Sequence, residues 1–335
     1  MTIKDLAAQT GYSVGTISRV LNNQPNVSEK ARKVILQAAE ESGFQLNVNA
    51  QQLKQQHGNS ILVVVKGISN ELFAALLESL QTKINQTNYP LVIDHIDENE
   101  NEVRRAVRLC REKKPLGVLF LGGNRKNFLE DFRHITIPCV LVTSDASDLP
   151  FPNLSSVSSD DAMAARMAID HLVSLGHRNI AVIGGDRFVS DTTRVRYQGC
   201  MEAFSRQGVR FDPELDYETA RFSFADGYRA AMSLLQRGRD FTALFAMSDV
   251  MAIGAIRALK DAGKGVPEDI SVMGLDGLDI GEYTIPKLAT VCQAVEELAQ
   301  RSLNLLLGQI EHKSGACHET IPVSLEWKES ARRIQ

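Results

Sequence analysis

Hydrophobic residues recur at helical spacing in three short segments at the start of the chain. The predicted inward-facing positions are, in chain order, Ile3, Leu6 and Ala7; Ile17, Val20 and Leu21; and Ala31, Val34, Ile35 and Ala38. Thr2, Ser13 and Ser28 are placed to cap these helices, and Gly11 is placed to end the first. The pattern predicts a small head of three helices. The polar stretch from 47 to 59 has too few apolar residues to fold alone, so it predicts a linker or a helix that forms on binding.

From Ile61 onward, short β-branched runs alternate with amphipathic helical stretches. The predicted strands are 61–65, 91–96, 117–121, 139–143, 180–183, 244–247 and 271–275, and the clearest helices are 73–86, 103–112, 162–175 and 250–262. This alternation is typical of parallel sheets flanked by helices. About 275 residues with this many strands favour two such sheets. We expect the second to begin near Asp160.

Length and charge indicate that the chain has two parts with different roles. A chain of 335 residues predicts two or three domains, and 44% apolar with 23% charged residues is ordinary globular composition. The net charge is −4, but the first 36 residues hold five basic and two acidic side chains, a net +3. A small basic head on an acidic body predicts two parts with different partners.

Several classes of protein are disfavoured by the residues themselves. No apolar run approaches the ~20 residues of a membrane helix, and the N-terminal residues lack an apolar signal core. The five cysteines form no CxxC pair, and the seven histidines show no HExxH spacing, so we expect no disulfide framework and no metal. Gly184-Gly185 lacks a full dinucleotide or phosphate-loop pattern, so we expect no cofactor. A cytoplasmic protein follows.

Gly11-Tyr12-Ser13-Val14-Gly15 matches the GxSxG string of hydrolases, which requires a strand before it. A helix is predicted there instead, so we interpret the segment as a helix-turn-helix. The second helix then exposes small and hydroxylated side chains and Arg19 at an end that fits a major groove. A plain three-helix bundle with a solvated Arg19 is the alternative, and the basic head favours DNA.

The chain closely resembles the lactose-repressor/galactose-repressor family of transcription regulators. The likeness is carried in the head and linker by 2–7, 11–22, 27–29, 41–44, Asn47 and 50–53, and in the body by Ser69-Asn70, 171–177, 180–185, 248–254, 267–272 and 274–276. These segments cover nearly the whole chain in the order of the family.

The resemblance implies an α/β protein with three parts. These are a helix-turn-helix head (1–45), a hinge helix or linker (46–58) and a periplasmic-binding-protein-like core (59–335) that binds an effector and dimerises. The core would hold two doubly wound parallel-sheet subdomains, about 59–159 with 291–319 and about 160–290 with 320–335. The implied function is a bacterial, nucleoid-associated repressor of a palindromic operator, and not an enzyme. Because no leucine heptad follows Trp327, we expect a homodimer rather than a tetramer.

The resemblance also assigns DNA-binding residues. Val14, Gly15 and Arg19 would read bases, and Ser13, Thr16, Ser18, Asn22 and Ser28 would contact the backbone. Leu53 resembles a wedge that unstacks a base step in the minor groove, with Ala50 on the same edge. Thr2 and Asn47 complete the set. Gly15 stands where the family often has a base-reading side chain, and Leu46 replaces a common proline where the hinge begins.

For the effector, the resemblance places Ser69 and Phe73 at the mouth of the first subdomain and Thr143 after its fourth strand. Arg196, Phe222, Ser248 and Asp276 would line the second. A carboxylate, a guanidinium and a flat ring suit a small polyol. Ser248 and Thr143 replace the Asn and Asp that relatives often carry, which leaves the particular sugar open.

Three alternatives stay open at this point. The effector is a purine or nucleoside stacked on Phe222, the chain binds a small molecule without touching DNA, or it is an intracellular α/β enzyme with an incidental helical head. The last would need an assembled base, nucleophile or cofactor loop, and the sequence offers none.

Overall fold

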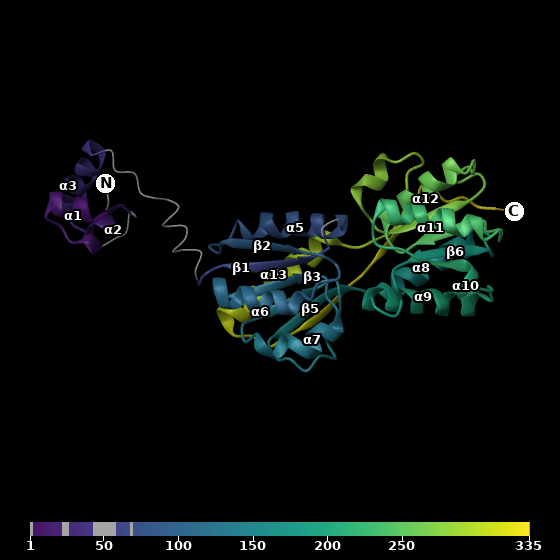
Figure 1. Ribbon diagram of the computed structural model, residues 1–335, viewed down its shortest axis with the longest axis horizontal. Helices are drawn as coiled ribbons and strands as arrows, with labels where there is room; N and C mark the ends of the chain where they lie inside the picture. Colours follow the sequence, from purple (N-terminus) through teal and green to yellow (C-terminus); the bar gives the residue numbers. More distant parts are fainter. Residues whose placement is uncertain (1–2, 22–26, 43–57, 68–69, 335) are drawn as a thin grey trace. The chain divides into compact units, whose positions relative to one another are not determined.

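The computed structural model describes residues 3–21, 27–42, 58–67 and 70–334 (Figure 1). The chain divides into two compact units, Met1–His57 and Gly58–Gln335. We describe each unit by itself.

The head contains three helices, α1 (Ile3–Thr10), α2 (Val14–Leu21) and α3 (Glu29–Glu41). Gly11 ends α1 with φ of 72°, a left-handed conformation that glycine adopts without strain. Leu6, Ile17 and Ile35 are fully buried at the centre of the bundle. The predicted stripes are confirmed for these residues, but Val34 is 40% exposed, so its inward assignment was wrong. It lies one position before Ile35, and the turn of α3 carries it away from the core.

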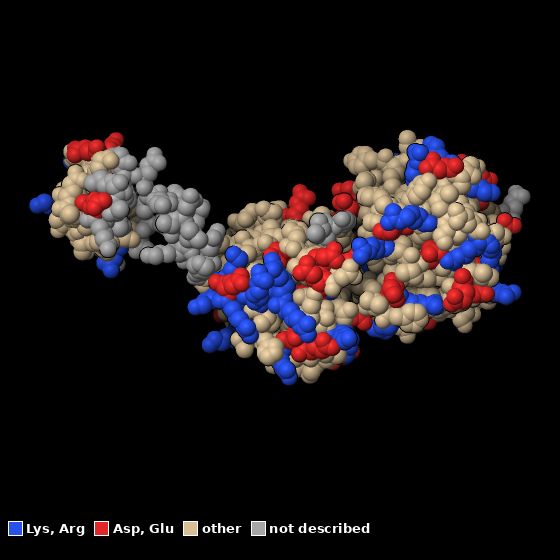
Figure 2. Space-filling view, viewed as in Figure 1, with Lys and Arg blue, Asp and Glu red and all other residues tan. Residues whose placement is uncertain are grey.

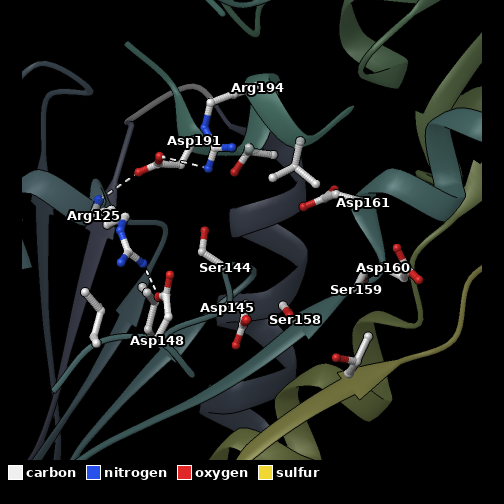
Figure 3. Close-up of a pocket in the computed structure, with 16 residues that line it drawn as sticks. Arg125, Ser144, Asp145, Asp148, Ser158, Ser159, Asp160, Asp161, Asp191 and Arg194 are labelled. Carbon is white, nitrogen blue, oxygen red and sulfur yellow. Dashed lines mark hydrogen bonds and ion pairs between the residues drawn. The ribbon is translucent and has the colours of Figure 1, made fainter. Parts of the chain in front are cut away.

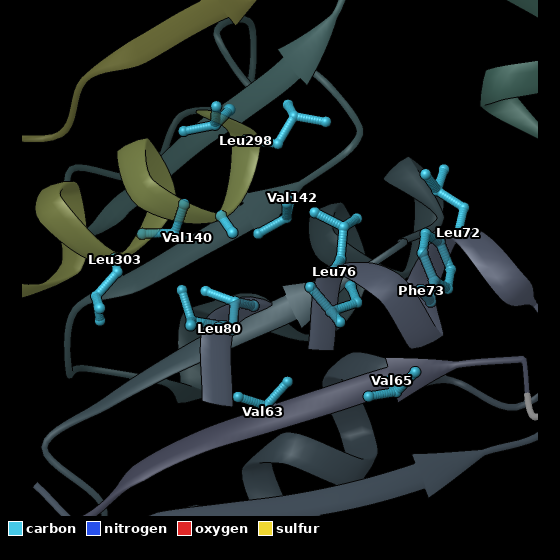
Figure 4. Close-up of a cluster of buried hydrophobic side chains, with 14 of the residues drawn as sticks. Val63, Val65, Leu72, Phe73, Leu76, Leu80, Val140, Val142, Leu298 and Leu303 are labelled. Carbon is cyan, nitrogen blue, oxygen red and sulfur yellow. The ribbon is translucent and has the colours of Figure 1, made fainter. Parts of the chain in front are cut away.

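The first subdomain of the core is a six-stranded sheet. Its order is β11 (His318–Ile321), β5 (Leu154–Ser159), β4 (Cys139–Val142), β3 (Gly117–Leu121), β1 (Ile61–Lys66) and β2 (Leu91–Ile96), with every pairing parallel. Odd positions of β1 face α5 (Glu71–Ile84) and α13 (Val295–His312), forming the cluster drawn in Figure 4. Even positions face α6 (Glu102–Lys113), α7 (Arg125–Asp131) and the short helix η1 (Phe132–His134). Burial on both faces explains the continuous apolar strands.

The second subdomain repeats this plan. Its order is β12 (Ser324–Glu326), β10 (Ala289–Cys292), β9 (Ser271–Asp276), β8 (Ala243–Ala246), β6 (Ile180–Gly184) and β7 (Tyr217–Thr219). Only β12, at the edge, runs antiparallel to its neighbour. Helices α8 (Asp161–Ser174) and α9 (Asp191–Gln207) cover one face, and α11 (Phe224–Gln236) and α12 (Asp249–Asp261) cover the other (Figure 1). The short helices α10 (Pro213–Asp216) and η2 (Asp279–Tyr283) complete the subdomain.

The chain crosses between the two sheets three times. The crossings follow β5 at Ser159, β10 at Cys292 and β11 at Ile321. The sequence placed the corresponding boundaries at 159, 290 and 319. The two sheets have matching strand orders, so β4 in the first corresponds to β9 in the second. The carboxyl ends of these strands are the edges at which open parallel sheets bind ligands.

Candidate DNA-binding and effector sites

The amino end of α2 is exposed and capped. The Ser13 hydroxyl accepts a hydrogen bond from the Thr16 amide at 3.1 Å, as the sequence predicted for a cap. A Ser28 cap on α3 is likewise confirmed, since its hydroxyl accepts from the Ala31 amide. Both hydroxyls are at an exposed position where a phosphate oxygen can also reach them.

The predicted base-reading residues all lie on the surface of the head. Val14 is 42% exposed, and Gly15 and Arg19 are exposed as well, whereas Ile17 and Val20 on the same helix are buried. Thr16 and Ser18 are half-buried between these two faces. One side of α2 therefore anchors the helix, and the other offers a methyl-bearing side chain and a guanidinium to base edges.

Some predicted residues lie outside the described part of the chain. These are Thr2, Asn22, Asn47, Ala50 and Leu53 for DNA, and Ser69 for the effector.

The visible face of the core carries acidic and basic side chains interspersed (Figure 2). The arginines of α6 illustrate this pairing, because Arg104 bonds Asp131 and Arg105 bonds Asp94. Paired charges of this kind offer little net attraction to a phosphate backbone.

Arg196 of α9 lies at the centre of a buried network in the core. Its Nε donates to Asp161 at 2.7 Å, its Nη1 donates to the Met247 carbonyl, and its Nη2 lies 3.7 Å from Asp276. Only 4% of Arg196 is exposed. The guanidinium that the family resemblance assigned to a ligand is thus largely occupied by the protein, in a buried ion pair with Asp161.

Asp276 joins this network to the crossings between the subdomains. Gln293, next to the end of β10, donates to Asp276 at 2.7 Å and accepts from Ser159, at the end of β5, at 2.7 Å. Burial raises the pKa of Asp276 to about 8, with Asp249 and Asp161 adding to the rise and Arg196 opposing it. Burial also raises the pKa of Asp161. A polar chain therefore runs from one crossing to another through the predicted effector residues.

Thr143 and Asp276 occupy corresponding places at the ends of β4 and β9. Their φ angles are 73° and 133°, in a region that side chains with a Cβ rarely adopt. Strained backbone of this kind gathers at ligand sites.

The other described residues predicted for the effector contact neighbouring parts of the protein. Phe73 is 8% exposed, and its ring packs where a Cβ at Gly122 would lie. Ser248 caps α12 by accepting from the Met251 amide, and Phe222 lies beside Gly185.

A cavity of about 400 Å³ lies between the two subdomains (Figure 3). Its lining is mostly polar and comes from both sides: Gly123, Arg125, Leu141, Ser144, Asp145, Asp148, Leu149, Ser158, Ser159, Asp160, Asp161, Asp191, Thr192, Arg194, Val195 and Thr320. None of the described residues predicted for the effector is in this set. Thr143 precedes Ser144, and Arg196 reaches the cavity only through Asp161.

Three contacts join the subdomains, the first of them between two residues that line the cavity. The Arg125 amide donates to Asp191 at 2.8 Å, and the Asn124 side chain donates to the Val189 carbonyl at 3.3 Å. Arg221 pairs with Glu98 at 2.7 Å. Sequence reasoning missed Asp191 and Asp161 because acidic residues in the first turn of a helix are usually stabilised by the helix dipole. Asp160 caps α8 by accepting a hydrogen bond from the Met163 amide.

Among the described residues, no cluster of His, Cys, Asp or Glu side chains is arranged to hold a metal ion. No helix in the described ranges is both long and apolar enough to cross a membrane.

Comparison with known proteins matches both units. Residues 2–47 match the family of bacterial regulatory proteins of the lacI type, and residues 169–331 match a periplasmic binding protein-like domain. The HTH-type transcriptional regulator MalR of Clostridium butyricum is 32% identical over the full length of both chains.

Solved structures agree. The Lac repressor dimer bound to operator and the anti-inducer ONPF aligns with a TM-score of 0.83 and 25% identity over 99% of each chain. The transcriptional regulator CelR in complex with cellobiose aligns with a TM-score of 0.71 and 26% identity, over 99% of this chain and 100% of CelR.

Proposed function

Because this chain belongs to the lacI family of bacterial regulatory proteins, we propose how a DNA-binding transcriptional regulator of this sequence reads its operator and responds to a ligand. The proposal is repression of transcription from a palindromic operator, relieved or reinforced by a sugar-like effector. The observation that carries it is the pairing of an exposed, capped α2 in one unit with an intersubdomain cavity in the other.

The head recognises the base sequence of the operator. Val14 and Arg19 contact base edges in the major groove, and Gly15 lets the helix approach closely. Ser13, Thr16, Ser18 and Ser28 position the head on phosphates. Thr2, Asn22, Asn47, Ala50 and Leu53 are assigned to DNA on the family pattern alone.

The effector occupies the cavity and bridges both walls. Its hydroxyls bond the Ser and Asp side chains that line the cavity. Asp161 links them to Arg196, and Arg196 in turn to Asp276. Thr143, Ser69, Phe73, Phe222 and Ser248 are retained as candidate contacts on the family pattern. The complex of CelR with cellobiose supports a saccharide as the ligand of this chain. We assign the cavity a binding role and no catalytic step.

The working form is a homodimer in the bacterial cytoplasm, where operator DNA is found. A palindrome presents two half-sites about one turn of DNA apart, ~34 Å, and each needs its own head. The Lac repressor dimer on its operator supports this arrangement. Sedimentation at micromolar concentration is expected to show a dimer, and a monomer or a stable tetramer would contradict the proposal.

Deletion of residues 1–57 tests the division of function. An operator is first selected from random duplexes with the full chain, and saccharides are screened by thermal shift. A ligand at 100 times its Kd stabilises by ~2.7 kcal/mol, which is easily detected. The core 58–335 is expected to keep the saccharide-induced shift and lose all operator binding. Operator affinity that survives the deletion would refute the proposal.

A further inference from the structure

The charges that line the cavity bear on the charge of its ligand. Five aspartates and two arginines line it, so carboxylates outnumber guanidinium groups by three. Both arginines already have acidic partners: Arg125 pairs with Asp148, and Arg194 lies 3.6 Å from Asp191. Figure 3 shows these two pairs, Arg125 with Asp148 on the side of the first subdomain and Arg194 with Asp191 on the side of the second.

The guanidinium of Arg196, which lies behind the cavity lining, is also paired with groups of the protein. Arg196 is surrounded by Asp161, Asp276 and the Met247 carbonyl, and Asp249 lies close enough to act on it. Within the described residues of the lining, every guanidinium is therefore paired with a carboxylate. A phosphate or carboxylate on a ligand would meet excess negative charge and find no unpaired cation.

Five further lining residues carry hydroxyls, and one of them, Ser159, already donates to Gln293. The hydroxyls of the other four, Ser144, Ser158, Thr192 and Thr320, make no hydrogen bond to any described residue. A hydroxyl that faces a cavity without a protein partner can bond a ligand or water there. Hydroxyls and carboxylates together present both donors and acceptors to a polyol.

We propose that the cavity selects an uncharged polyhydroxylated ligand, an unmodified saccharide, and rejects the phosphorylated and acidic forms of the same sugar. The inference rests on the cavity being the effector site of the proposed function. It adds a criterion that the family pattern does not provide, because that pattern leaves the ligand's charge open.

The test compares matched neutral and anionic probes on the full chain. Calorimetry is run with glucose against glucose 6-phosphate and glucuronate, ribose against ribose 5-phosphate, and with maltose and cellobiose. The neutral member of a pair is expected to bind at least tenfold more tightly, and the difference is expected to shrink as salt is raised. An anionic probe that binds as tightly as its neutral partner, or more tightly than every neutral probe, overturns the inference.

One variant tests whether the carboxylates that line the cavity cause the preference for neutral ligands. Asp148→Asn removes a carboxylate and frees Arg125, so the affinity for the phosphorylated probe is expected to rise at least threefold relative to the affinity of the same variant for the neutral probe. Asp240→Asn removes an exposed carboxylate elsewhere in the second subdomain and is the matched control. A neutral-to-anionic ratio that Asp148→Asn leaves unmoved overturns the assigned cause.

The outcome also separates this inference from the proposed function. A neutral saccharide that binds with the expected selectivity but leaves operator affinity unchanged supports the inference and refutes effector control. A sugar phosphate that changes operator affinity supports effector control and refutes the inference.

Discussion

Single residues at the ends of corresponding strands have the most unusual conformations in the core. Thr143 and Asp276 each hold a positive φ that costs about 1–3 kcal/mol and persists only where surrounding structure enforces it. For Asp276 the enforcing contacts are Gln293 and Arg196. Strain and a buried carboxyl at one position are features that gather at ligand sites, and they agree with the proposed place of Asp276 behind the effector site.

The carboxyl of Asp276 predicts a pH dependence of stability. Its folded pKa of about 8 lies above the ordinary 3.8, so between pH 4 and 8 the folded chain holds a proton that the unfolded chain lacks. Stability from this group is complete at low pH and is lost as pH rises through 8. The melting temperature of Asp276→Asn is therefore expected to fall less than that of the parent between pH 5 and 8.5. Parallel curves would contradict the shifted pKa, and Asp240→Asn is the control.

Arg19 is the residue whose loss is expected to affect operator binding most directly. A bidentate guanidinium contact to guanine discriminates by about 1–3 kcal/mol, so Arg19→Ala is expected to weaken specific binding five- to 150-fold. Binding to a random duplex should change much less. Fluorescence anisotropy with both duplexes measures the two effects, and Gln37→Ala, another exposed position of the head, is the control. Unchanged specific affinity would remove Arg19 from base reading.

At the scale of elements, two glycines allow α11 and α12 of the second subdomain to pack with their backbones in close contact. A Cβ at Gly254 would overlap the Phe224 carbonyl oxygen, and a Cβ at Gly227 would overlap the Met251 backbone. The two glycines face opposite helices, so the backbones approach from both sides. This packing holds Asp249, at the start of α12, where its carboxylate accepts from the Leu278 amide just after β9.

Gly254→Ala is therefore expected to destabilise the core despite alanine's better helix propensity. Overpacking against backbone costs about 1–3 kcal/mol and outweighs the gain of about 1 kcal/mol from replacing glycine in a helix. The matched control is Gly308→Ala in α13, where the new methyl meets only the flexible Ser314 side chain. Denaturant unfolding of both variants measures the difference. Equal stabilities for the two would show that α11 and α12 can separate at little cost.

At the scale of the whole molecule, the three crossings connect the two walls of the cavity to each other. A ligand that bonds both walls changes the balance between closed and open subdomains only by as much as it prefers one of them. Because effector and operator then act on one equilibrium, their influence on each other is a single coupling free energy.

Reciprocity is the prediction at this scale. If saturating saccharide changes operator affinity by some factor, saturating operator must change saccharide affinity by the same factor, expected at 5- to 150-fold. Calorimetry of saccharide binding to free and operator-bound protein measures one side, and anisotropy measures the other. A factor close to one, with the saccharide shown to bind, would contradict the proposed coupling between effector and operator.

Local sequence determined the elements and the family. Helix periodicity, Ser13 and Ser28 caps and β-branched runs depend on neighbours along the chain, so the head and seven strands were predictable. The lacI membership followed from collinear motifs. β5 was missed because Leu154–Ser159 contains four serines, and its strand conformation is enforced by β4 and β11 on either side. The hydroxyl of Ser155 accepts from the Cys317 amide and that of Ser156 bonds the His318 ring, each 162 residues away.

Tertiary structure alone decided the cavity. Its lining combines α7, α9 and the ends of β4 and β5 with Thr320 of β11, segments that meet only because the chain crosses between sheets three times. The packing of α8 against α9 pairs Arg196 with Asp161, which turned a predicted ligand contact into a buried ion pair, and the crossings bring Gln293 beside Ser159. Sequence spacing specifies which residues share a helix face or a strand edge. It does not specify which carboxylate will neutralise which guanidinium, because that depends on distances set by the packed fold.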